Sequence, residues 1–220
     1  MSRLICISGS SGVGKTTVSK LIETVIGSDN VVVLSGDDLH KWERTDPMWE
    51  KYTHLDPYSN NLDMGYSHIL SLKKGESISR SRYNHNTGKF DFPVEILPKS
   101  HIIYEGLHSS YSDDVLNISD FSIFIHTDEQ LKREWKIQRD TTTRGYTTEQ
   151  VINTINRRKK DEIKYIMPQQ NKVDIIVQFC KNIDKSISLE YNNVTGKGED
   201  IMIQVKHLYN SVRVCGDLFV

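Results

Sequence analysis

The sequence predicts an α/β fold, with a mainly parallel five-stranded core sheet and helices on both faces. Two observations predict this class. Short apolar runs typical of buried strands alternate along the chain with segments whose apolar residues recur at helical spacing. Strands that alternate with helices pair in parallel, because each helix returns the chain to the same edge of the sheet. The expected strands cover residues 4–7, 31–34, 101–104, 121–125 and 173–179.

Four helices are expected between these strands. Residues 13–26 and 61–72 carry apolar side chains that would share one helix face. Two more helices are expected at capping boxes, in which Thr127 and Thr147 are each followed three residues later by a glutamine. Pro168 should end the second of these helices, because proline lacks the backbone N–H that a helix interior needs.

The rest of the chain is expected to be less regular. Residues 37–60 are polar and aromatic and predict a loop, and residues 88–90 predict a hairpin or an irregular excursion. Strand-like segments at 187–191 and 201–205 flank a polar turn, which predicts a small β appendage. We therefore expect one main domain over residues 1–180 and a small β-rich extension of that domain over residues 181–220.

The composition argues against several classes of partner. The chain has 220 residues, 26% of them charged, with a formal net charge of −1, so we expect no nucleic acid or membrane partner. No segment has the roughly eighteen apolar residues of a spanning helix, and we expect no signal peptide. The three cysteines, Cys6, Cys180 and Cys215, are widely spaced and predict no disulfide or zinc framework. This pattern favours a reducing, cytoplasmic location.

The segment GSSGVGKTT directly follows the first expected strand and precedes a helix. It matches the phosphate-binding P-loop, in which glycines let successive backbone N–H groups point at a phosphate. Lys15 would reach the β- and γ-phosphates of ATP, and the Thr16 hydroxyl would coordinate Mg²⁺. The residues expected to bind ATP are Gly9, Ser10, Ser11, Gly12, Val13, Gly14, Lys15, Thr16 and Thr17.

Two carboxylates follow the second and third expected strands, at the sheet edge where open α/β proteins bind ligands. Asp37 is the candidate base that accepts a proton from an acceptor hydroxyl. Glu105 stands where an acid would hold Mg²⁺ or its water, together with Thr16. Asp38 competes with Asp37 for the role of base and is ranked second, because we expect it to face away.

Several cations are candidates for binding phosphate. Arg44 lies with His40 in the loop at 37–60, and together they would form an anion site away from the P-loop. Arg139 and Arg144 lie between the two capped helices, where many P-loop kinases carry a lid that neutralises the transferring phosphoryl group. We expect this lid over residues 139–147. The basic run 157–160 is expected to form a solvated helix face.

A longer series of motifs extends beyond the P-loop. The segments GDDLHKWER, THLDPYSNN, RYNH, YEGLH, EWKIQRDTTTRGYTTEQVINTINRR and PQQNKVDIIVQF follow one another in this order. The series, over roughly residues 3–180, resembles the phosphoribulokinases of the phosphoribulokinase/uridine kinase family. The bacterial members of that group are longer and continue with more sheet after the PQ segment.

The resemblance implies a kinase that uses ATP and Mg²⁺ to phosphorylate a hydroxyl of a small sugar phosphate similar to ribulose 5-phosphate. It implies Asp37 as the base and Glu105 as the acid beside Mg²⁺. The cations it implies at the transferring phosphate are Lys15, Arg139 and Arg144. The sugar-phosphate contacts it implies are His40, Arg44, Tyr83 and His85.

Other functions stay open on the sequence. A uridine or cytidine kinase would use the same base but would stack a nucleobase on aromatic side chains and would not need Arg44. A kinase for another small molecule, such as pantothenate or glycerate, would keep the same reaction. A regulatory nucleotide-binding module would keep the P-loop but would not need Asp37. The sequence also leaves assembly into a homo-oligomer open.

Overall fold

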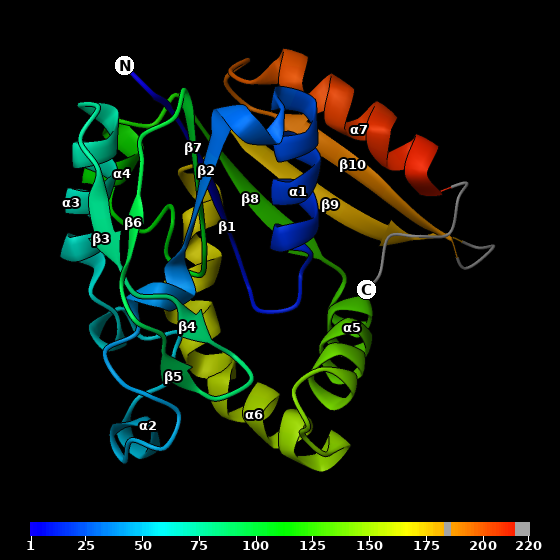
Figure 1. The fold of residues 1–220 in the computed structure, drawn as a ribbon. Helices are drawn as coiled ribbons and strands as arrows, with labels where there is room; N and C mark the ends of the chain where they lie inside the picture. Colours follow the sequence, from blue (N-terminus) through cyan, green and yellow to red (C-terminus); the bar gives the residue numbers. More distant parts are fainter. Residues whose placement is uncertain (183–185, 214–220) are drawn as a thin grey trace.

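The computed structural model describes residues 1–182 and 186–213. A six-stranded sheet forms its centre, with the strand order β10-β9-β8-β1-β7-β2 (Figure 1). Its strands are β1 (Arg3–Gly9), β2 (Val31–Ser35), β7 (His101–Glu105), β8 (Phe121–Thr127), β9 (Ile175–Lys181) and β10 (Ile187–Asn193). The first five pair in parallel, and β10 pairs antiparallel with β9. The expected α/β class and its five parallel core strands are confirmed.

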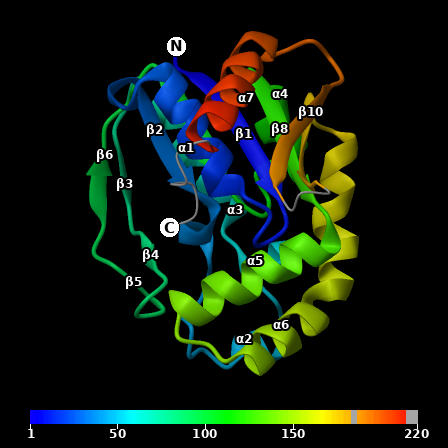
Figure 2. The same cartoon turned by 90° about the vertical axis from the view of Figure 1, so that its right-hand side faces the viewer.

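Strand β1 lies in the middle of the sheet, between β7 and β8. Its side chains alternate between two cores, since successive residues of a strand point to opposite faces. Ile5 and Ile7 pack beneath helices α1 (Lys15–Ile26) and α7 (Glu199–Arg213), which cover one face (Figure 2). Leu4 and Cys6 pack on the other face against α3 (Leu62–Lys73). Each fully buried aliphatic side chain contributes about 1.5–3 kcal/mol by leaving water.

Three helices lie beyond the carboxyl ends of the parallel strands, below the sheet in Figure 1. They are α2 (Met48–Lys51), α5 (Glu129–Thr142) and α6 (Thr148–Asp161). Helix α6 continues as a π-helical turn, Glu162–Ile166, and a 3₁₀ turn, Met167–Asn171. The α-helical geometry thus ends before Pro168, which lies in the 3₁₀ turn at a position where its missing N–H costs nothing.

The two expected capping boxes have different outcomes. Thr147 and Gln150 form the expected reciprocal pair at the start of α6. Thr127 does not cap α5, because it is the last residue of β8 and its hydroxyl donates to the backbone oxygen of Val13 at 3.0 Å. Asp128 caps α5 instead, with its carboxylate accepting two backbone N–H groups.

The C-terminal extension differs in part from its expected structure. The strand expected at 187–191 is confirmed as β10, which joins the main sheet. The strand expected at 201–205 is wrong, because this segment belongs to helix α7. Met202, Val205 and Tyr209 recur at helical spacing and are fully buried against α1 and the sheet. Cys215 lies outside the described residues.

Smaller elements complete the fold. A short antiparallel pair joins β3 (Ile78–Arg80) to β6 (Val94–Ile96), and the expected hairpin joins β4 (Tyr83–Asn84) to β5 (Lys89–Phe90). Helix α4 (Asp113–Asn117) and four 3₁₀ turns, at Ser28–Asn30, Gly36–Leu39, Pro57–Ser59 and Met167–Asn171, are also short. Over the described residues, no helix combines the length and the apolar character that crossing a membrane requires.

Candidate active site

The glycine-rich loop between β1 and α1 has a backbone that only glycines fit. Gly9, Gly12 and Gly14 all have positive φ angles, of 139°, 87° and 94°. A Cβ atom on Gly14 would lie 2.7 Å from the ring of Phe179, and one on Gly9 would lie 2.5 Å from a backbone oxygen of β8. The loop is therefore packed against the sheet in the shape that a phosphate-binding P-loop requires.

The nine residues expected at ATP lie together around this loop and the first turn of α1. The side chain of Val13 is an exception, since it is buried in the hydrophobic core and leaves only its backbone at the loop. Lys15 is folded over the loop, and its Nζ atom donates to the backbone oxygens of Gly9 and Ser10 at 3.0 and 2.8 Å. Burial lowers the pKa of Lys15 to about 8, against the opposing charges of Asp37 and Glu105.

Glu105 ends strand β7 beside the first turn of α1. Burial raises the pKa of its carboxyl, while Lys15 and a hydrogen bond from the Thr16 hydroxyl act in the opposite direction. Its Oε2 atom is buried and has no hydrogen-bond partner. A carboxylate oxygen without a partner, next to a hydroxyl, is the donor set that Mg²⁺ takes when phosphates and water supply its other ligands. These two residues therefore fit a magnesium ion.

Asp37 follows strand β2, at the same edge of the sheet. The ends of β2 and β7 approach so closely that a Cβ on Gly36 would lie 3.0 Å from the Cα of Gly106. His85 Nε2 lies 3.0 Å from Asp37 Oδ2, and His40 Nε2 lies 3.8 Å from Oδ1. Although burial raises the pKa of Asp37, the His85 hydrogen bond and the charge of His40 hold it well below its usual range.

Asp38 faces a different way from its neighbour. Its Oδ1 accepts the backbone N–H of Tyr83 at 2.8 Å, and its Oδ2 accepts the Nε–H of Arg80 at 3.3 Å. Both carboxylate oxygens are therefore used within the protein. The side chain of Asp38 is 12% exposed, whereas that of Asp37 is 34% exposed.

The four residues expected at the sugar phosphate lie together on this side of the site. The ring of Tyr83 is edge-on to the rings of His40 and His85, with both centroids 5.2 Å away. Arg44 donates to the backbone oxygen of His85, and its guanidinium lies over the ring of Tyr146, 5.7 Å from the centroid. A small pocket adjoins this group and is lined by Gly36, Asp37, His40, Asn60, Leu62, Tyr104, Leu107 and His108.

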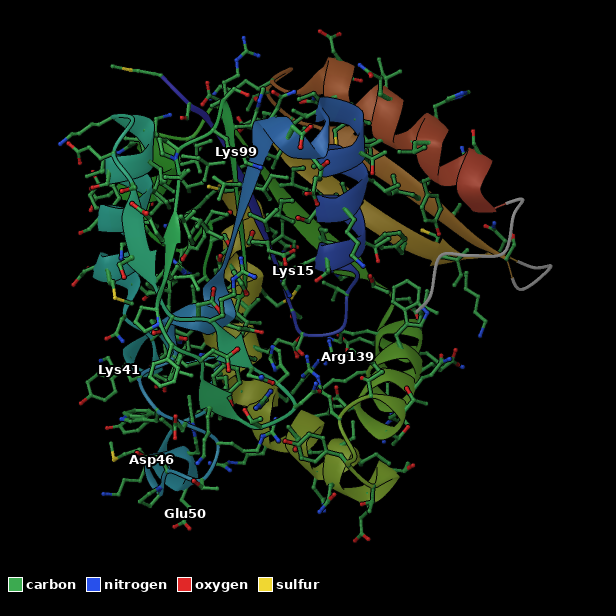
Figure 3. The ribbon with its side chains drawn as sticks, in the orientation of Figure 1. Lys15, Lys41, Asp46, Glu50, Lys99 and Arg139 are labelled. Atoms are coloured by element: carbon green, nitrogen blue, oxygen red, sulfur yellow. The ribbon has the colours of Figure 1, made fainter. Side chains whose placement is uncertain are left out.

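The two arginines of the lid expected at 139–147 meet at a carboxylate that the sequence did not single out, and Arg139 lies in the last turn of helix α5. Asp140 Oδ1 lies 2.7 Å from Arg139 and 3.6 Å from Arg144, and its Oδ2 lies 2.7 Å from Lys136 Nζ. Lys136 Nζ also lies 3.4 Å from the Ser11 hydroxyl of the P-loop. In Figure 3, Arg139 and Lys15 lie near each other at the carboxyl ends of the strands, whereas Lys99 lies at the opposite end of the sheet.

Burial lowers the pKa of Lys136 to about 8, against the charge of Asp140. The chain offered a signal for this residue, because Lys136 stands four residues before Asp140 on a helix and so shares a face with it. Lys132, one turn earlier, is also buried and pairs with Glu162 at 2.7 Å. The Ser10 hydroxyl donates to the same Glu162 carboxylate, which ties the P-loop to α5 and to the π-helical turn.

The expectation of a solvated face at 157–160 is wrong for Arg158, whereas Arg157, Lys159 and Lys160 are exposed as expected. Arg158 NH2 lies 2.7 Å from His54 Nδ1, and Arg157 donates to the backbone oxygen of Trp49. Burial and the charge of Arg158 lower the pKa of His54, so its ring is neutral and can accept this hydrogen bond. Arg158 follows the buried Val151 by seven residues, a spacing that places both on one helix face.

The parallel sheet and the glycine-rich loop between its central strand and α1 define a P-loop α/β protein. Residues 4–186 match the model of the Phosphoribulokinase / Uridine kinase family, and the chain belongs to that family.

Individual relatives agree with this assignment. The chain is 38% identical to a phosphoribulokinase of Synechocystis sp. over 175 residues, which are 80% of this chain and 53% of the relative. It is 31% identical to a uridine kinase of Borreliella burgdorferi over 195 residues, which are 85% of this chain and 91% of the relative. The chain thus spans about half the length of the curated phosphoribulokinases it matches. A solved phosphoribulokinase from Rhodobacter spheroides shares its fold, with a TM-score of 0.66, 23% identity and coverage of 91% of this chain and 84% of that one.

Proposed function

We propose that this protein is a kinase that transfers the γ-phosphate of ATP to a hydroxyl of a small sugar phosphate. The observation that supports this proposal best is the position of Asp37. Its ionised carboxylate lies at the sheet edge that also holds Lys15, and it is held there by His85. A nucleotide-binding switch has no use for such a base beside a pocket, whereas an acceptor hydroxyl needs one.

In this proposal Asp37 accepts the proton as the O–H bond of the acceptor breaks. The acceptor oxygen then bonds to the γ-phosphorus, and the bond from that phosphorus to the β–γ bridging oxygen breaks to release ADP. Thr16 and Glu105 would hold Mg²⁺, which would neutralise charge on the phosphate oxygens. Lys15 binds the β- and γ-phosphates, and Arg139, Arg144 and Lys136 stabilise the negative charge of the transition state from the lid side.

The phosphate of the acceptor is assigned to a second cationic centre, away from the P-loop. Arg44 lies against the hairpin and over the ring of Tyr146, and Arg158 on α6 contacts His54 in the loop at 37–60 and interacts electrostatically with the same Tyr146. Their guanidinium groups carry the planar donor sets that bind phosphate in pairs of hydrogen bonds. An unphosphorylated nucleoside would leave this centre without an anion, which favours a sugar phosphate over uridine.

The test is Mg²⁺-dependent ADP release from the whole protein with a panel of acceptors. The panel contains ribulose 5-phosphate, other pentose and hexose phosphates, the corresponding free sugars, glycerate, pantothenate, uridine and cytidine. We expect turnover with a sugar phosphate and at least about tenfold less with the matching free sugar, since a charge-assisted hydrogen bond contributes about 1.5–3 kcal/mol. Turnover with uridine or cytidine alone would replace the proposal by a nucleoside kinase. Background turnover with every acceptor would support a regulatory module.

A further inference from the structure

A buried ion pair between Arg80 and Asp38 lies next to the candidate base, Asp37. The side chain of Arg80 is 1% exposed and that of Asp38 is 12% exposed, and Arg80 Nε lies 3.3 Å from Asp38 Oδ2. Arg80 also donates to the backbone oxygen of Ser35, and its NH1 lies 3.3 Å from His68 Nδ1. A guanidinium held by three partners at the end of β2 is fixed in place, and removing one partner of such a pair is costly.

The other oxygen of Asp38 holds the hairpin. Tyr83 N donates to Asp38 Oδ1 at 2.8 Å, at the first residue of β4. The hairpin has only two pairs of facing residues, Tyr83 with Phe90 and Asn84 with Lys89. A hairpin this short does not hold its own position, so its anchors decide where it lies. On its other side the hairpin is anchored to residues 43 and 44: Glu43 Oε1 accepts the Phe90 N–H at 3.2 Å, and the Arg44 backbone N–H donates to the oxygen of Gly88 at 2.7 Å.

The hairpin in turn carries His85 to the candidate base. His85 Nε2 lies 3.0 Å from Asp37 Oδ2, and its ring packs edge-on against Tyr83. A continuous set of contacts therefore runs from Arg80 through Asp38, Tyr83 and His85 to Asp37. The two adjacent aspartates have opposite tasks, since one faces the acceptor and the other fixes the group that orients it.

We propose that Arg80 and Asp38 are positioning residues, which hold the hairpin at 83–90 so that His85 orients Asp37 for the reaction. The proposal rests on the proposed function, because it assigns a role toward the base of that reaction. The hydrogen bonds of both residues go to other parts of the protein, namely to each other, to Ser35, to His68 and to Tyr83. Their loss should slow phosphoryl transfer and leave the P-loop unaffected, because Lys15 and the glycine-rich loop make no contact with this pair.

The test compares Asp38→Ala with Asp174→Ala. Asp174 is a matched control, because its side chain is 9% exposed, accepts the Ser122 N–H at 2.8 Å and pairs with Lys197 at 3.6 Å. It directly precedes β9, toward the opposite edge of the sheet from β2. Both changes remove a carboxylate that binds a backbone N–H and a cation, so both should lower the melting temperature. Kinetics are measured below the melting temperature of either variant.

We expect Asp38→Ala to lower kcat about a hundredfold, the loss that a misplacement of about 1 Å produces, with the Kd of ATP within about twofold of wild type. Asp174→Ala should keep kcat within about twofold. His85→Ala should lower kcat by a similar factor, and the double variant should be no slower than either single variant, because both changes remove the same support. Effects that multiply in the double variant, or an unchanged kcat in Asp38→Ala, would overturn the proposal.

Two further measurements keep the outcome decisive. If Asp38→Ala does not fold, Arg80→Lys replaces it in the test. This variant keeps the charge but cannot reach three partners, so its kcat should lie between that of the wild type and the hundredfold lower value. Hydrogen–deuterium exchange of the peptide covering residues 83–90 should be faster in Asp38→Ala and in Arg80→Lys than in the wild type, and unchanged in Asp174→Ala. If the wild type phosphorylates no acceptor, the proposed function fails, whereas exchange that stays slow in both variants overturns the anchoring itself.

Discussion

The two halves of the site are built in different ways. The proposed nucleotide half is centred on one continuous segment, residues 9–17, whose backbone is shaped by three glycines with positive φ angles. The acceptor half brings together side chains from separate segments, including Asp37, Arg44, His85 and Arg158. A site made of backbone tolerates changes elsewhere, whereas a site made of side chains depends on each support. We therefore expect the side chains of the acceptor half to determine which substrate is bound.

The largest effect is expected in the nucleotide half. Lys15→Ala should lower kcat about a thousandfold or more, because it removes the cation that meets the β- and γ-phosphates. The measurement is ADP release at saturating Mg²⁺ and acceptor. Lys99→Ala, at the opposite end of the sheet, is the control and should leave kcat unchanged. Near-normal activity of Lys15→Ala would remove the P-loop from the chemistry.

Asp37→Asn tests the centre of the acceptor half. We expect kcat to fall by about 10²–10⁴, the usual contribution of a general base, while the Kd of ATP stays the same. The measurement is single-turnover phosphoryl transfer together with ATP titration. A variant that keeps more than about a tenth of wild-type kcat would show that another group accepts the proton.

Arg44→Ala should affect the acceptor half of the site and not the nucleotide half. The KM of a phosphorylated acceptor should rise about 10–100-fold, which corresponds to the loss of a charge-assisted hydrogen bond of about 1.5–3 kcal/mol. The KM of ATP should not change. Arg82→Ala, at an exposed residue directly before the hairpin, is the control and should change neither value. An equal rise in both KM values for Arg44→Ala would remove Arg44 from the acceptor half.

The pH dependence of ATP binding tests the nucleotide half alone. The pKa of Lys15 in the free protein is lowered to about 8, and phosphates beside it would raise that pKa. Binding above pH 8 must therefore take up a proton, so the Kd of ATP should be about tenfold higher at pH 9 than at pH 7. Burial also lowers the pKa of Lys136 to about 8, so a phosphate beside this residue would act in the same direction. Calorimetry in two buffers measures the proton uptake, and a Kd that is constant over this range contradicts the assignment.

The smallest effect on activity is expected outside both halves. Met202→Ala removes a fully buried side chain from α7, so the free energy of unfolding should fall by about 2–4 kcal/mol. Below the melting temperature kcat should not change, because α7 packs on α1 away from the acceptor. Ile203→Ala, at a position that is 54% exposed on the same helix, should unfold like wild type in urea. A separate early transition in Met202→Ala would show that α7 unfolds on its own.

The sequence predicted the parts of the molecule that depend on local signals. The parallel strands are apolar runs buried on both faces, and the P-loop needs glycines at fixed positions, so both are visible in the residues themselves. The sequence also predicted that Asp37 and Glu105 lie at the same edge of the sheet, because the carboxyl ends of parallel strands meet there.

What the sequence missed depends on tertiary contacts. Residue type alone does not distinguish Arg158, which reaches His54, from Lys159, whose side chain is 48% exposed. The cap of α5 moved from Thr127 to Asp128 because pairing with β9 keeps Thr127 in the sheet. The segment 201–205 contains β-branched residues but folds as a helix, because its apolar spacing matches the groove beside α1.

The position of β1 has a consequence for how the chain folds. This strand is the first in the sequence, yet it lies in the middle of the sheet, where Arg3 faces His101 and Ile5 faces Phe121. Its partners lie about a hundred residues away, so a long loop must close before they can pair. Contacts of such high order slow folding, and they predict a rate limited by the docking of β7 and β8 onto β1. The P-loop therefore gains its shape only when more than half of the chain is already in place.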